Sequence, residues 1–235
     1  MTIEEELQKA KVAVEAARDE ALLAVQFHET WRPTVADPDL LERMGNSFAT
    51  HSFHIIRIAL RREVLLALMR LWDNDSRSVK VTAIAELLRN NGLFEALVCQ
   101  RAKAFGYSVD VTNSMHEALK PKRDDILRLV RKYTASSGQA TVLDRLRTLR
   151  HEQLAHRQAH NPTDPAELRH TDEEVEEFYQ DTLEIVRLML SVLLGTAFDI
   201  ARDGGDVYRH HADFFWAAAR GERTEGHPCF RRPKN

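Results

Sequence analysis

Two side chains whose chemistry suits phosphodiester cleavage, Arg150 and His156, lie close together in the stretch from Leu146 to Arg157. Leucines recur in this stretch at helical spacing, so it is predicted to form an amphipathic helix. At about 100° per residue, Arg150 and His156 lie roughly 120° apart around that helix. An arginine stays charged and holds a phosphate through two hydrogen bonds, whereas an imidazole exchanges a proton near neutral pH. The pair therefore suits catalysis on a phosphodiester.

The same stretch carries further polar side chains that are candidates for binding the substrate. They are His151, Gln153, Arg147 and Arg157. Gln153 lies between the two candidate catalytic residues on the predicted helix. An amphipathic helix rich in arginine and histidine yields such pairs by chance, so the spacing alone also allows a solvated helix face.

The run Leu149-Arg150-His151, followed by Leu154-Ala155-His156-Arg157, resembles the signature of the HEPN superfamily (higher eukaryotes and prokaryotes nucleotide-binding). It is most similar to the abortive-infection AbiU-like branch. That signature has an arginine, usually a polar residue next, and then a histidine often preceded by alanine. His151 stands where asparagine is more usual. Residues 53–73, which end Arg70-Leu71-Trp72-Asp73, and residues 79–88 are similar to the family's early helices.

The resemblance covers about residues 40–200 and implies an all-α helical bundle that forms a homodimer. It further implies metal-independent endoribonuclease activity of a toxin or phage-defence type, with no cofactor. Arg150 would neutralise the scissile phosphate and His156 would transfer a proton, so RNA is the expected substrate. An antitoxin protein is a possible partner. The alternative is a catalytically inactive HEPN-like module that binds nucleotide, RNA or a protein partner.

The angle between Arg150 and His156 favours a site that two chains share. A second motif helix facing the first would place the arginine of one subunit near the histidine of the other, and the resemblance implies the same arrangement. The alternative is a monomer whose C-terminal helix, with Phe214, Phe215 and Trp216, covers the motif face.

Composition bounds the compartment and the domain organisation. The chain has 235 residues, 43% of them hydrophobic, and a net charge of −3. This length suits a single helical domain, residues 1–235, with an N-terminal helical part at about 1–36 and a flexible tail at about 221–235. The acidic N-terminus lacks the pattern of a signal peptide, and residues 188–198 are too short to span a bilayer. We therefore expect a cytoplasmic protein without membrane association.

Periodicity and capping signals predict long antiparallel helices, with the motif helix packed against the helix that begins at Thr171. Thr171 and Glu174 form a capping-box pattern. Residues 106–111 are read as a loop, and Gly204-Gly205 as a helix terminator. The helices are expected at about 3–31, 38–73 with a possible division at Gly45, 79–89, 93–105, 112–134 with a possible break at Pro121, 139–158, 171–203 and 207–220.

Metal and thiol chemistry are disfavoured. His151 and His156 are five positions apart, whereas the zinc-binding His-Glu-x-x-His motif needs four so that both rings face one metal. The pairs His51/His54 and His210/His211 lack the recurring carboxylate partners of a di-metal site. Cys99 and Cys229 lie in unlike contexts and are expected to be inert.

Local charge supports an RNA-binding surface across the motif helix and the helix before it. Ten basic residues stand against four acidic ones there, although a solvated face is the alternative. The basic residues are Lys120, Lys122, Arg123, Arg128, Arg131, Lys132, Arg145, Arg147, Arg150 and Arg157, and the acidic ones are Asp124, Asp125, Asp144 and Glu152.

Overall fold

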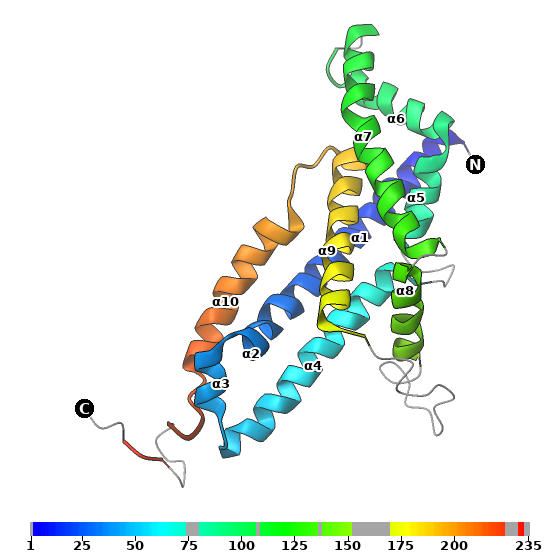
Figure 1. Ribbon diagram of the computed structural model, residues 1–235. Helices are drawn as coiled ribbons and strands as arrows, with labels where there is room; N and C mark the ends of the chain where they lie inside the picture. The colour runs from blue at the N-terminus through cyan, green and yellow to red at the C-terminus, as the bar shows by residue number, and fades with distance from the viewer. Residues whose placement is uncertain are drawn as a thin grey trace.

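The computed structural model describes residues 2–73, 80–106, 109–135, 138–151, 170–223 and 230–232. Within these ranges every regular element is helical, and the helices pack side by side around α1 (Figure 1). The prediction of an all-α helical bundle is confirmed.

Helix α1 (Ile3–Trp31) runs through the middle of the bundle and begins at a capping box between Thr2 and Glu5. Its packing face is built from small side chains that are completely buried, so neighbouring helices approach it closely. Helix α4 (Phe48–Leu71) lies along one side of α1, and α10 (Gly205–Ala218) lies along the other (Figure 1). The buried small residues of α1 include Ala10, Val14, Ala17, Ala21 and Ala24.

Two short helices, α2 (Pro33–Ala36) and α3 (Pro38–Met44), connect α1 to α4. Asp37 caps α3, since its side chain accepts hydrogen bonds from the N–H groups of Asp39 and Leu40. Gly45, with φ of 29°, ends α3. The helix expected at 38–73 is therefore divided at Gly45, as the sequence analysis considered possible. A small apolar cluster that includes Phe53 and Trp216 joins α3 and the start of α4 to the end of α10.

Helices α5 (Val81–Arg89), α6 (Asn91–Lys103), α7 (Val109–Thr134) and α8 (Gly138–Leu149) occupy the other end of the molecule (Figure 1). The loop predicted at residues 106–111 is wrong at its end, because α7 already begins at Val109. Pro121 lies inside α7 and does not divide it. Buried side chains on both sides of the proline, Leu119 and Ile126, hold the helix against its neighbours.

Helix α9 (Asp172–Met189) starts at the predicted capping box of Thr171 and Glu174. The long helix expected at 171–203 is wrong, since a wider π-helical turn (Leu190–Leu194) follows α9 and Gly195, with φ of 71°, ends it. Arg101 donates hydrogen bonds to the carbonyls of Ser191 and Val192 at this end. A Cβ on residue 195 would lie 2.6 Å from the Arg101 guanidinium, so the site accommodates glycine.

Gly204 and Gly205 do not terminate a helix either. A second π-helical turn (Ile200–Gly204) runs directly into α10. A Cβ on Gly204 would lie 3.3 Å from the Leu22 side chain of α1, so this glycine serves close packing. Within the described ranges, none of the helices combines the length and apolarity needed to cross a membrane.

Helix α8 packs against α7 and the end of α4. Its links to α9 are polar: Arg145 donates to Glu174 at 2.8 Å and Gln139 to Glu177 at 2.8 Å. The predicted packing of the motif helix on the helix from Thr171 is therefore only partly right. Helix α10 lies across α1 and α9 from α8 (Figure 1), so it does not cover α8.

A charged cluster around the buried residues His28 and Glu29 joins α1, α9 and α10. The His28 ring lies between two carboxylates, 2.9 Å from Glu176 and 3.2 Å from Glu29, and stacks on Tyr179 at 4.0 Å between ring centroids. Arg209 donates to the other oxygen of Glu29 at 2.9 Å. His28 and Glu29 are only 5% and 4% exposed, so these charges compensate one another out of water.

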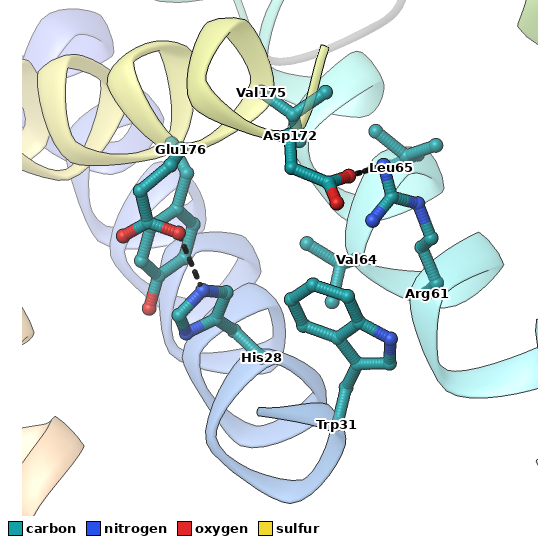
Figure 2. A pocket seen from close by; sticks show the side chains of 9 residues that line it. His28, Trp31, Arg61, Val64, Leu65, Asp172, Val175 and Glu176 are labelled. Carbon is teal, nitrogen blue, oxygen red and sulfur yellow. Dashed lines mark hydrogen bonds and ion pairs between the residues drawn. The ribbon is translucent and has the colours of Figure 1, made fainter. Parts of the chain in front are cut away.

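Figure 2 shows the small cavity beside this cluster, between α1, α4 and α9. Trp31 and His28 line it from α1, and the ion pair between Arg61 and Asp172, 2.6 Å long, lines it from α4 and α9. Its volume of about 20 Å³ is the space of a single water molecule. The cavity is therefore too small to be a substrate site.

The cluster gives the stability of the protein a defined pH dependence. Burial disfavours the charged imidazole, but hydrogen bonds and charges from Glu176 and Glu29 outweigh it and raise the pKa of His28 above its usual 6.5. The stabilisation from His28 is thus complete below about pH 6.5 and is lost as the pH rises through the raised value. Burial alone would raise the pKa of Glu29, but hydrogen bonds and charges from His28 and Arg209 outweigh burial and lower this pKa overall. The hydrogen bond from His28 also lowers the pKa of Glu176. Their stabilisation is lost as the pH falls below about 4.5.

We expect the free energy of unfolding to be highest between these two limits. In urea titrations, the difference between the native protein and His28→Gln should shrink as the pH is raised from 6 to 9. A difference that is constant or grows over this range would show that His28 is neutral in the folded state.

Candidate functional site

Arg150 lies directly after α8, where the chain passes the C-terminal end of α4. Its Nη1 atom is 3.1 Å from the Oδ2 atom of Asp73, the second residue after α4. The two side chains are 31% and 18% exposed, so the ion pair is partly shielded from water. A guanidinium carries five N–H donors, and this contact uses one nitrogen. Asp73 thus orients Arg150, whose side chain stays partly exposed.

The residues of α8 that face the core explain why Arg150 has this position. Val142, Leu143 and Leu146 are buried against the main core, and Leu149 packs against its edge. This apolar face matches the helical spacing expected from the sequence. It turns the polar residues of α8 toward α4, α9 and solvent.

Arg147, which is predicted to bind substrate, makes contacts within the chain. Its Nη2 atom donates to the backbone carbonyl of Trp72 at 3.1 Å, and its Nη1 atom contacts Asp144 at 3.3 Å. Carbonyls at the end of a helix have no partner within that helix, so Arg147 caps α4. Together with the pair of Arg150 and Asp73, this contact fixes α8 to α4.

Trp72 is buried beneath the contact between α4 and α8. It is completely buried and makes edge contacts with Tyr133, at 5.4 Å between ring centroids, and a tilted contact with Phe178, at 5.6 Å. Its indole N–H donates to the Thr182 hydroxyl at 3.0 Å. Helices α4, α7 and α9 thus meet at one aromatic cluster, and this packing holds the following residue, Asp73, in place.

The remaining predicted site residues divide into two groups. His151 is described and exposed, next to Arg150. Gln153, His156 and Arg157 lie outside the described residues. The structure therefore fixes the position of one member of the predicted catalytic pair.

Asp73 is the residue of this site that the sequence reasoning missed. The sequence predicts Asp73 to be the last residue of the helix at 38–73, in the run Arg70-Leu71-Trp72-Asp73 on which part of the resemblance rests. The sequence does offer one indication of this role, namely a carboxylate directly after a large aromatic residue at the end of a predicted helix. The arginine that Asp73 contacts, Arg150, is identified only by the packing of α8 against α4.

Many of the cations expected to form an RNA-binding surface are engaged within the chain. Acidic residues of α9 bind several of them: Lys132 contacts Glu177 at 2.7 Å and Asp181 at 2.5 Å. The charge count from the sequence omitted these acids, which lie far away along the chain. The other contacts are Lys120 with Asp124, Arg128 with Asp125, Arg145 with Glu174, Lys122 with Ser191, and Arg123 with the carbonyls of Leu88 and Arg89.

A metal site needs several histidine, cysteine or carboxylate side chains close together. Among the described residues, no three histidine, cysteine, aspartate or glutamate side chains are grouped in this way. His51 and His54 lie exposed on α4, and His210 and His211 on α10.

Comparison with known families agrees with this geometry. The sequence matches the HEPN family AbiU2 over residues 7–215, which is most of the chain. The protein therefore belongs to the HEPN class and, within it, to the AbiU2 family, as the residues around Arg150 indicated. Neither a curated protein nor a solved structure matches the chain.

The capping role of Arg147 leads to a prediction on stability. Replacement by alanine leaves the Trp72 carbonyl without its donor, so Arg147→Ala should lower the free energy of unfolding by about 1–3 kcal/mol. The matched control is Arg131→Ala, at an exposed arginine of α7, with an expected change within about 0.5 kcal/mol. Urea denaturation measures both, and equal effects would contradict the capping role.

Proposed function

We propose that this protein is a metal-independent endoribonuclease of a toxin or phage-defence type. The observation that carries the proposal is the position of Arg150, oriented by Asp73 at the surface, in a chain of the AbiU2 family. RNA carries its own nucleophile, the ribose 2′-hydroxyl, so an arginine and a proton-transferring histidine suffice for cleavage.

Each residue then has a defined role. The 2′-oxygen attacks the neighbouring phosphorus atom and the bond from phosphorus to the 5′-oxygen breaks, which leaves a 2′,3′-cyclic phosphate. Arg150 stabilises the negative charge that develops on the phosphate oxygens. His156 takes the proton of the 2′-hydroxyl or gives one to the leaving 5′-oxygen. Asp73 is a positioning residue, since it acts through Arg150.

The alternative is a catalytically inactive module that binds nucleotide, RNA or a protein partner such as an antitoxin. The observation that favours it is the engagement of many basic side chains of α7 and α8 within the chain, which reduces the charge available to RNA. A binding module of this kind cleaves no RNA in any variant.

The first test replaces the two catalytic candidates. Arg150→Ala and His156→Ala should each lower RNA cleavage by about 10²-fold or more, as expected for loss of charge stabilisation or proton transfer. Asp73→Asn should have a smaller effect, about tenfold, because Arg150 remains present but is less well oriented. Initial rates on a labelled RNA measure these losses, and circular dichroism checks the fold.

The matched control for Arg150→Ala is Arg202→Ala, at an exposed arginine outside the basic residues of α7 and α8, which should cleave RNA at the native rate. Native-like cleavage by either the Arg150 or the His156 variant, in protein free of contaminating nuclease, would refute the assignment. Equal losses in all of the arginine variants would indicate a general charge effect.

The second test concerns the chemistry. Cleavage should persist in EDTA and should stop when the ribose at the cleaved position is 2′-deoxy, since the proposed nucleophile is then absent. Mass spectrometry of the products should find the 2′,3′-cyclic phosphate or its hydrolysis product. Activity that a chelator abolishes, or that extends to DNA, would point to a metallonuclease.

A further inference from the structure

A pocket lies at the end of α9 that is farther from α8. It is bounded by α7, by the π-helical turn that follows α9 and by the loop at residues 195–199. Figure 1 shows α7 beside this end of α9, and the two elements are in contact. Ser191 of the pocket lies about 25 Å along the helix from Glu174, which binds Arg145 of α8. The volume of the pocket, about 270 Å³, is just below the range of about 300–1,000 Å³ that is usual for drug-sized ligands, so it suits a small molecule.

The wall of this pocket holds its shape through hydrogen bonds within the chain. The backbone N–H of Thr196 donates to the Leu190 carbonyl at 3.2 Å, which ties the loop to the π-helical turn. Asp199 and Asp203 then close the loop. The Asp199 side chain accepts from the N–H of Arg202 at 3.0 Å, and the Asp203 side chain accepts from the N–H of Asp199 at 3.1 Å. The wall is thus fixed without a ligand.

The carboxylates around the pocket are largely engaged with donors of the protein. Asp203 uses its second oxygen to accept from Nε of Arg202 at 3.1 Å, so both of its oxygens have partners. Glu184 binds Arg187, which lines the pocket, through both of its oxygens at 2.6 Å. This pair uses Nε and Nη2 of Arg187 and leaves Nη1 for a further acceptor. Few carboxylate oxygens are therefore left to accept a hydrogen bond in the pocket.

Lys122, from α7, is the cation of this pocket that contacts no carboxylate within the described residues. Its Nζ atom is 2.7 Å from Oγ of Ser191. An ammonium group can only donate, so the Ser191 hydroxyl accepts this hydrogen bond and keeps its own proton for another acceptor. Thr196, which is exposed on the loop, supplies a second hydroxyl. An ammonium group and two hydroxyls, from three different elements, therefore surround one space.

Donors that come from three elements suit an acceptor whose oxygens point in several directions. The oxygens of a phosphate group are arranged in this way around a tetrahedral centre, whereas those of a carboxylate lie in one plane. Lysine and the hydroxyls of serine and threonine are common donors to phosphate oxygens. The rest of the pocket includes Ala197 and Phe198, and Phe198 is partly buried against the core. This apolar part of the wall suits a short organic group attached to the phosphate.

We infer that this pocket binds the phosphate group of a small phosphomonoester. The Lys122 ammonium group and the hydroxyls of Ser191 and Thr196 donate to the phosphate oxygens, and Phe198 contacts the organic part. The pocket lies at the opposite end of α9 from α8, so it is separate from Arg150. The inference therefore does not rest on the proposed ribonuclease activity.

Amide chemical shifts of the full chain, followed by NMR at constant ionic strength, test the site with three probes. Inorganic phosphate and phenyl phosphate should shift the signals of Ser191 and of residues 196–199 until they saturate. Phenyl phosphate should bind more tightly, because its ring contacts Phe198. Equal affinity for these two probes would show that the ligand is the free phosphate ion. Acetate should cause no saturating shift, and binding of acetate as tight as that of phosphate would overturn the inference.

Matched variants test the assigned donors. Lys122→Met keeps the length of the side chain but removes its charge, so the affinity for phenyl phosphate should fall about tenfold or more. The control is Lys103→Met, at an exposed lysine of α6 outside the pocket, which should bind with native affinity. Thr196→Val, at an exposed loop position, should weaken binding about threefold, and it keeps the test decisive should Lys122→Met not fold. Equal weakening by the two lysine variants, native affinity in Thr196→Val, or no saturating shift in the pocket would overturn the inference.

Discussion

The burial of Trp72 is the constraint on which the candidate site depends. Its indole closes the space between α4, α7 and α9, and its hydrogen bond to Thr182 fixes the ring. The backbone carbonyl of the same residue receives the Arg147 side chain, and the next residue, Asp73, receives Arg150. One buried aromatic residue thereby determines where α4 ends and where the motif helix attaches.

Charge pairing between helices shapes the surface around this site. Helix α9 carries an acidic face, and its carboxylates meet Lys132 from α7, Arg145 from α8 and His28 from α1. Exposed pairs of this kind contribute little stability individually, whereas the buried pairs at His28 restrict how α1 and α9 can pack. Fewer basic side chains are consequently available to an anionic ligand than the count of basic residues suggests.

The sequence predicts a helix well where contacts between neighbouring residues determine its start, its end or its buried face. The capping box at Thr171, the division at Gly45 and the apolar face of α8 are all properties of a few neighbouring residues. Prediction failed where distant contacts decide. The sequence predicts that Gly204 terminates a helix, but this glycine gives room to the Leu22 side chain of α1. Arg150 was identified from its motif, whereas its partner Asp73 required knowledge of how α4 and α8 meet, and His156 lies outside the described residues.

Arg101 and Gly195 illustrate a constraint that acts in both directions. The guanidinium fills the space in which a side chain at position 195 would lie, and it supplies donors to the carbonyls that the π-helical turn leaves open. Replacing the glycine would displace the arginine, and replacing the arginine would leave those carbonyls unpaired without relieving the left-handed backbone at 195. The two positions, far apart in the sequence, are therefore coupled, because a substitution at either one disturbs the contact between them.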